Sequence, residues 1–177
     1  MNIIETPIKD LVILESSVFG DERGFFMETF RAEWLQQYTF VQDNHSKSIR
    51  RTLRGLHYQL TKPQGKLVRV TDGEVFDVAV DLRQSSETFG QWYGELLSGD
   101  NKKLFFVPPG FAHGFMVLSD SAEFQYKCSE YYAPDDEHVI AWNDPDLDIR
   151  WPLEAGEPML SAKDSQGKAF KDATYYA

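Results

Sequence analysis

The chain has 177 residues, of which 42% are hydrophobic and 14% aromatic, so it suits one domain with a sizeable core. Its net charge of −10 excludes nucleic-acid binding over a broad basic surface but allows a small anionic ligand held by clustered Arg and Lys. No apolar run approaches the roughly 20 residues that span a bilayer, and the N-terminal stretch lacks the apolar segment of a signal peptide. The single cysteine, Cys128, offers no disulfide or zinc pair. We expect one cytoplasmic domain over residues 1–177, without membrane or nucleic-acid partners.

Short segments of alternating polarity, separated by turn residues, recur along the chain. They cover residues 11–19, 24–30, 51–60, 66–73, 74–82, 91–98, 103–108, 113–119 and 123–132. Helical patterns are short and occur at residues 31–38 and 161–167. The C-terminal part is rich in Pro, Asp and Trp. This organisation predicts an all-β antiparallel sandwich or barrel with a few short helices and an irregular C-terminal wrap.

Two of the four histidines lie in apolar segments beside a glycine. His57 follows Gly55 in "RTLRGLHYQL", and His113 occurs in "FVPPGFAHGF". One such histidine is most simply a satisfied core residue, but two in similar settings favour a shared site. We expect the other two, His45 and His138, to be solvated residues of polar loops.

The spacing Pro-x-Gly-x-x-His in "FVPPGFAHGF" resembles the second motif of the cupin superfamily of small β-barrels. The first cupin motif contains His-x-His followed by Glu, and here "GLHYQ" has Gln59 in place of the second histidine. Val117 replaces the Asn that usually ends the second motif. Because a neutral Gln amide is a poor ligand for zinc or iron, we expect a cupin-type jelly-roll barrel without a catalytic metal.

A barrel without a metal could use His57 as a general base on a carbon next to a carbonyl. The resulting enolate needs a cation or donor, for which Lys66 is a candidate, and inversion needs a proton donor on the opposite face, for which Tyr126 is a candidate. The alternative for Tyr126 is a core residue with a solvated hydroxyl. We interpret Cys128, two residues further on, as a small core residue rather than a reactive thiol.

Several longer motifs identify a resemblance that extends from about residue 5 to about residue 165. They are "FGDERGFFMETF", "FVQDNHSKS", "LRGLHYQ", "QGKLVRV", "GEVFDVAVDLR", "PPGFAHGF", "YKCSEYY" and "LSAKD". In order and spacing they resemble the dTDP-4-dehydrorhamnose 3,5-epimerases. The resemblance implies a homodimeric jelly roll that needs no cofactor. It also implies conversion of dTDP-4-dehydro-6-deoxy-D-glucose to dTDP-4-dehydro-L-rhamnose, in the pathway to dTDP-L-rhamnose.

The resemblance also implies roles for particular residues. His57 matches the base, Asp164 the carboxylate that orients it, Tyr126 the proton donor and Lys66 the enolate stabiliser. The positions that match substrate contacts are Arg23, Phe25, Glu28, Gln42, Asp43, Asn44, Arg54, Lys66, His113, Tyr132, Glu137 and Lys163. Strict alternation would place Arg54 and His57 on opposite faces of a strand, so we expect a β-bulge at Gly55 that brings them together.

Four other functions remain open at this level. They are a mono-epimerase that inverts only C3 or C5, a sugar keto-isomerase, a metal-dependent cupin oxygenase and a non-catalytic nucleotide-sugar binding module. Gln59 argues against the oxygenase, and the presence of His57, Tyr126, Lys66 and Asp164 together argues against the binding module.

Overall fold

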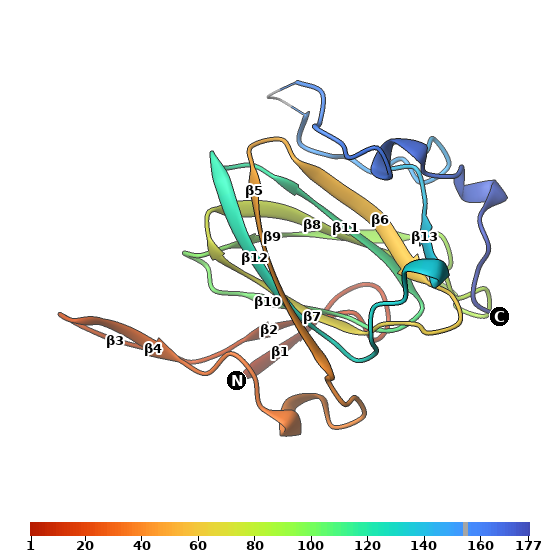
Figure 1. The fold of residues 1–177 in the computed structure, drawn as a ribbon. Coiled ribbons are helices and arrows are strands. Elements are labelled where there is room, and N and C mark those ends of the chain that lie inside the picture. The colour runs from red at the N-terminus through yellow and green to blue at the C-terminus, as the bar shows by residue number, and fades with distance from the viewer. Residues whose placement is uncertain (154–155) are drawn as a thin grey trace.

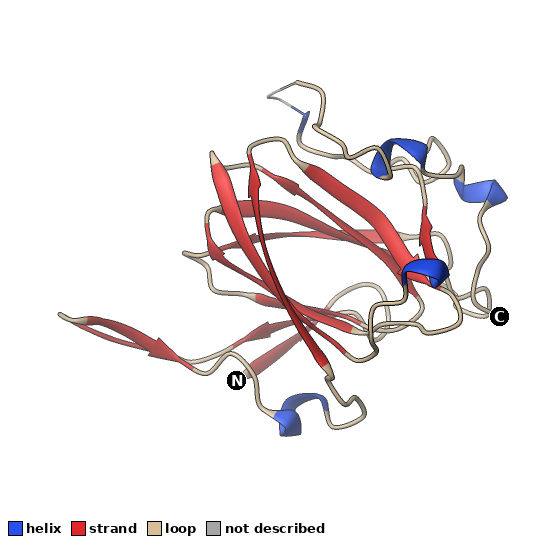
Figure 2. Cartoon of the chain, in the orientation of Figure 1, coloured by secondary structure: helices blue, strands red, loops and turns tan. Residues whose placement is uncertain are grey.

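The computed structural model describes residues 1–153 and 156–177, and most of its regular secondary structure is strand (Figures 1 and 2). The strands are β1 (Asn2–Glu5), β2 (Val12–Glu15), β3 (Val18–Asp21), β4 (Gly24–Met27), β5 (Gln42–Ile49), β6 (Leu53–Gln59), β7 (Lys66–Asp72), β8 (Glu74–Asp81), β9 (Trp92–Ser98), β10 (Leu104–Val107), β11 (Phe111–Val117), β12 (Ser121–Cys128) and β13 (Glu137–Val139). The 3₁₀ helices are η1 (Ala32–Leu35), η2 (Pro134–Asp136), η4 (Asp164–Gln166) and η5 (Phe170–Asp172). Within the described ranges, no helix has the length and apolar character needed to cross a membrane.

Two antiparallel sheets form the body of the molecule. The six-stranded sheet has the order β1-β2-β10-β7-β12-β5, and the five-stranded sheet has the order β13-β6-β11-β8-β9. Strands β3 and β4 form a separate hairpin that projects away from the sheets (Figure 1). The expected all-β jelly roll is confirmed.

The alternation within each strand separates an inner from an outer face. Inward side chains of both sheets make one core, in which the rings of Phe115 on β11 and Phe124 on β12 stack with centroids 4.2 Å apart. Burying a side chain of this size contributes roughly 1.5–3 kcal/mol, and Phe124 is 1% exposed. Both rings line the cavity described below.

The outer face of the five-stranded sheet is covered by the C-terminal segment, as the sequence predicted. Val78 and Val80 of β8 point outward and pack in a second core with Leu147 and Trp151 of that segment. The outer face of the six-stranded sheet carries a third, smaller core that includes Leu35 of η1. Each sheet is therefore apolar on both faces over much of its area.

Some expectations were wrong in detail. The helical pattern at residues 31–38 yields only η1, and the segment at 11–19 is broken between β2 and β3. His45 lies in β5, where its Nε2 is 3.1 Å from Glu123 Oε2, and not in a loop. His138 lies in β13, where its ring stacks on that of Tyr58.

Candidate active site

A β-bulge in β6 brings two polar side chains to the same inner face. His57 pairs with His113 of the neighbouring strand β11, and Arg54 pairs with Phe115. The two pairs are three residues apart along β6 but only two apart along β11, so β6 contains one extra residue. Gly55 within the bulge has a φ of +132°, a conformation that L side chains rarely adopt. The bulge expected at Gly55 is confirmed, and Arg54 and His57 both line one pocket.

His57 is bound through one ring nitrogen to a buried carboxylate. Its Nε2 lies 2.7 Å from Oδ1 of Asp164, whose side chain is 4% exposed at the start of η4. Burial raises the pKa of Asp164, but hydrogen bonds from His57, Ser161 and the Gly55 N–H outweigh it and lower the pKa to about 2. Because an ionised Asp164 can only accept, Nε2 donates, and Nδ1 of the neutral ring carries the lone pair.

The opposite wall of the pocket belongs to the six-stranded sheet. Tyr126 of β12 and Lys66 of β7 point inward from neighbouring strands. Burial raises the pKa of the Tyr126 phenol and lowers the pKa of the Lys66 ammonium, although Cys128, Glu137 and Asp77 act to raise the latter. Cys128 is 1% exposed on the same face as Tyr126, and its Sγ accepts a hydrogen bond from Asn44.

The pocket between these walls has a volume of about 310 Å³. It brings together nine of the side chains expected at the site. They are Gln42, Asn44, Arg54, His57, Lys66, His113, Tyr126, Tyr132 and Glu137. Asp164 joins them through His57.

A polar cluster lies along the pocket beside His57. Glu137 accepts hydrogen bonds from the Tyr132 hydroxyl and from Lys163 through Oε2, and its Oε1 is 3.8 Å from His57 Nδ1. Burial raises the pKa of Glu137, but Lys163 and Tyr132 lower it below the ordinary range of a glutamate. The cluster therefore places an ionised carboxylate beside the lone-pair nitrogen of His57.

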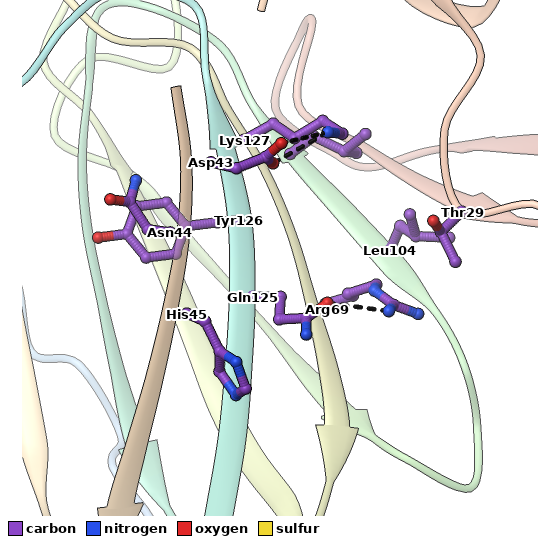
Figure 3. A pocket seen from close by; sticks show the side chains of 10 residues that line it. Thr29, Asp43, Asn44, His45, Arg69, Leu104, Gln125, Tyr126 and Lys127 are labelled. Atoms are coloured by element: carbon purple, nitrogen blue, oxygen red, sulfur yellow. Dashed lines mark hydrogen bonds and ion pairs between the residues drawn. The ribbon is translucent and has the colours of Figure 1, made fainter. Parts of the chain in front are cut away.

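Four expected site residues lie outside this pocket. Asp43 is on the outer face of β5 and pairs with Lys127, on the side of β5 and β12 away from Tyr126 (Figure 3). Arg23 and Phe25 are in the β3–β4 hairpin, where Phe25 is 62% exposed. Glu28, just after the hairpin, pairs with Arg31.

The structure also adds side chains that the sequence did not single out for the site. They are Ser46, Gln64, Phe115 and Phe124, which line the pocket, and Asp77, whose Oδ1 is 2.7 Å from His113 Nε2. Asp77 is fully buried, and burial raises its pKa against the opposing effects of His113 and Lys66. Alternation within 74–82 places Asp77 on the inner face with Val75. This alternation is the sequence feature from which the position of Asp77 could have been predicted.

Outside the pocket, the outer face of the six-stranded sheet carries another hollow, of about 350 Å³ (Figure 3). There Arg69 donates to Oε1 of Gln125. Asp43 and Lys127 also pair with each other there, whereas His57 lines the inner pocket with Asp164 bound to it.

Comparison with known proteins agrees with this geometry. The family model described as dTDP-4-dehydrorhamnose 3,5-epimerase matches residues 5–172. The chain belongs to this epimerase family. It is 56% identical over 178 residues to the dTDP-4-dehydrorhamnose 3,5-epimerase of Pseudomonas aeruginosa, with 98% of each chain covered.

Solved structures of these epimerases show the same fold. The Legionella pneumophila 3,5-epimerase in complex with dTDP-4-keto-L-rhamnose is 52% identical, with a TM-score of 0.94 and coverage of 98% of this chain and 94% of that one. A 3'-monoepimerase from Streptomyces bikiniensis, in complex with dTDP-quinovose, is 33% identical, with a TM-score of 0.88 and coverage of 94% and 86%. The protein is therefore an isomerase with a cupin-type fold, and the greater similarity to 3,5-epimerases favours double epimerisation over the mono-epimerase alternative.

Proposed function

We propose that this protein inverts C3 and C5 of dTDP-4-dehydro-6-deoxy-D-glucose and so forms dTDP-4-dehydro-L-rhamnose. One observation carries the proposal: His57, which is bound to Asp164, and Tyr126 stand on opposite walls of one pocket, because their strands belong to different sheets. Inversion at carbon requires removal of a proton from one side and its return from the other. A base and an acid that face each other across a cavity meet this requirement.

The chemistry uses the ketone of the substrate as its electron sink. Nδ1 of His57 takes the proton from the carbon next to C4, and the C–H electrons pass into the carbonyl to give an enolate. Lys66 donates a hydrogen bond to the enolate oxygen, and Asp164 stabilises the imidazolium that has formed. The enolate then collapses and takes the Tyr126 hydroxyl proton on its other face. Loss of the imidazolium proton to solvent and protonation of the tyrosinate from solvent restore both groups. Because C3 and C5 both adjoin the C4 ketone, the same groups then serve the second centre.

The phosphates of the nucleotide need cations. Arg54 donates through Nε and Nη2 to the Ser48 hydroxyl, an uncharged partner, so its positive charge is available to a diphosphate. Lys66 adds a second positive charge within the same pocket. These groups supply the local positive cluster that an acidic protein needs to bind an anionic sugar nucleotide.

Solvent exchange followed by NMR tests this function. Incubation of the protein with dTDP-4-keto-6-deoxyglucose in D₂O should place deuterium at both C3 and C5, and His57→Ala should abolish it. Deuterium at one carbon only would establish a mono-epimerase. Absence of exchange at both carbons with the wild-type protein would refute epimerisation of this substrate.

We further propose that the protein works as a homodimer in which the β3–β4 hairpin of one copy completes the site of the other. The hairpin leaves Phe19, Phe25 and Phe26 more than half exposed, at 64%, 62% and 66%, and exposed apolar groups of this extent are typical of an interaction surface. The hairpin also carries Arg23 and Phe25, which match substrate-contacting positions but lie outside the pocket of their own chain.

Subunit complementation tests the exchanged arrangement. His57→Ala and Arg23→Ala should each be inactive alone, and mixing them should restore activity, because one site of the mixed dimer then has both native residues. No recovery after mixing, with subunit exchange confirmed by native mass spectrometry of the mixed dimer, would refute a contribution from the partner.

A further inference from the structure

Three glutamine side chains hold four consecutive residues of the loop between β12 and η2. Gln64 Nε2 donates to the Glu130 carbonyl at 2.8 Å, and Gln59 Nε2 donates to the Tyr131 carbonyl at 3.2 Å. Gln42 Oε1 accepts from the Tyr132 N–H, and Gln59 Oε1 accepts from the Ala133 N–H, both at 2.9 Å. Loop peptides have no neighbouring strand to pair with, so these side chains take the place of a strand partner.

Gln59 is the central member of this set. Its side chain is 3% exposed, and besides Tyr131 and Ala133 it binds the Lys62 carbonyl through Nε2 at 2.8 Å. An uncharged amide supplies two donors and an acceptor from one planar group, and all are used here. A histidine, which a metal-binding cupin would have at this position, offers only two ring nitrogens pointing in different directions and could not make these three bonds.

The loop held in this way carries Tyr132 to the pocket. The Tyr132 hydroxyl donates to Glu137 Oε2 at 2.8 Å, and Glu137 Oε1 lies 3.8 Å from His57 Nδ1. We propose that Gln59 is a positioning residue for the reaction: it fixes the 130–133 loop so that Tyr132 holds Glu137 beside the proton-accepting nitrogen of His57. The effect on catalysis rests on the proposed function. The contacts between Gln59 and the loop do not depend on it.

Amide hydrogen exchange tests the contact between Gln59 and the loop. Gln59→Met keeps the length of the side chain and removes its hydrogen bonds, so the Ala133 amide should exchange at least about tenfold faster than in the wild type. Gln125→Met is the matched control, because Gln125 lies on the outer face of β12 and binds Arg69; it should leave the Ala133 amide unchanged. An Ala133 amide equally protected in Gln59→Met and wild type would overturn the proposal.

A double-mutant cycle tests the consequence for catalysis. Gln59→Met should lower kcat/KM about tenfold in the native background and less than about twofold in the Tyr132→Phe background, because both changes interrupt the same path. Equal losses in the two backgrounds, or no loss in either, would overturn the positioning role. A wild-type protein without turnover would refute the proposed function instead, and the exchange measurement would still decide the loop contact.

If Gln59→Met is too unstable to purify, Gln59→Glu takes its place in the same cycle. A carboxylate at this position can still accept from the Ala133 N–H but cannot donate to the Lys62 and Tyr131 carbonyls. Coupling between Gln59→Glu and Tyr132→Phe would support the positioning role, and strict additivity would contradict it.

Discussion

A side chain on Gly55 would collide with the backbone of Gly114. An added Cβ would lie 2.5 Å from the Gly114 Cα and 2.9 Å from the carbonyl oxygen of His113. The two glycines thus allow β6 and β11 to approach at the bulge that turns Arg54 and His57 into the pocket.

Gly55→Ala should lower the free energy of unfolding by about 1–3 kcal/mol, because the extra methyl overpacks a buried contact between two backbones. It should also lower activity, because the displaced bulge carries His57. Gly24→Ala is the control: Gly24 has a similar φ, +137°, but nothing within 4 Å of its added Cβ. Urea unfolding of both variants separates the effect of the collision on stability from the effect of placing alanine at a positive φ. Equal destabilisation would show that the contact with Gly114 contributes nothing.

Asp164→Asn should remove a pH-dependent part of the stability. The pKa of Asp164 is about 2 in the folded protein, below the value of about 3.9 in an unfolded chain. Such a group stabilises the fold above its unfolded pKa, by about 2 kcal/mol, and this contribution is lost as pH falls from about 4 toward 2. Urea midpoints measured between pH 5 and 2 should therefore fall less steeply in the variant.

The same variant should lower kcat by about 100-fold or more, because the imidazolium of His57 loses its counter-ion. Asp144→Asn is the control for a buried acid outside the pocket. Asp144 accepts hydrogen bonds from the backbone N–H groups of Asp146, Leu147 and Phe170 in the C-terminal segment. Asp144→Asn should lower the free energy of unfolding and leave kcat unchanged. An unchanged kcat in Asp164→Asn would restrict Asp164 to a structural role.

Tyr126→Phe should separate proton removal from inversion. Burial raises the pKa of Tyr126, so the phenol remains a proton donor throughout the neutral range. Without it, His57 still removes the substrate proton and returns deuterium to the same face, while the inverted product forms about 100-fold more slowly. NMR in D₂O distinguishes exchange with retention from inversion. Tyr93→Phe, whose hydroxyl binds Glu95 outside the pocket, should behave as the wild type.

Lys66→Met should raise stability and lower activity. Burial lowers the pKa of Lys66, so the charged form opposes folding at neutral pH. That opposition shrinks as pH rises from the lowered pKa of the folded state and is gone above the unfolded value of about 10.4. The variant should therefore be more stable than the wild type at pH 7, with a difference that narrows at alkaline pH, while kcat falls about 100-fold with loss of the enolate partner. Thermal unfolding and turnover at pH 7 and 10 check both parts.

The strands that carry apolar inward residues were predictable, and β5, whose inward residues are polar, was not. In 74–82 one face packs in the inner core and the other against the C-terminal segment, so alternation was visible. The inward residues of β5 are Gln42, Asn44 and Ser46, which line the pocket. With polar side chains on both faces, β5 carries no alternation of polarity and reads as a loop.

Most of the residues that meet in the pocket could be named singly from the sequence motifs, but their contacts could not. The bulge at Gly55 followed from the need to place Arg54 and His57 on one face. The proximity of Tyr132, Glu137 and Lys163 depends on where the C-terminal segment crosses the pocket, which local pattern does not encode. The pairing of Asp77 with His113 likewise depends on the register between β8 and β11.

The stacked rings of Phe115 and Phe124 give the pocket a hydrocarbon surface to which each of the two sheets contributes one ring. If the proposed sugar substrate rests against these rings, its depth relative to His57 on one wall and Tyr126 on the other depends on aromatic packing rather than on a polar contact. Substrate range in this fold is thereby linked to the interior of the barrel: replacing either ring with a smaller side chain would let a hexose sink deeper and would change which ring carbon lies level with the base.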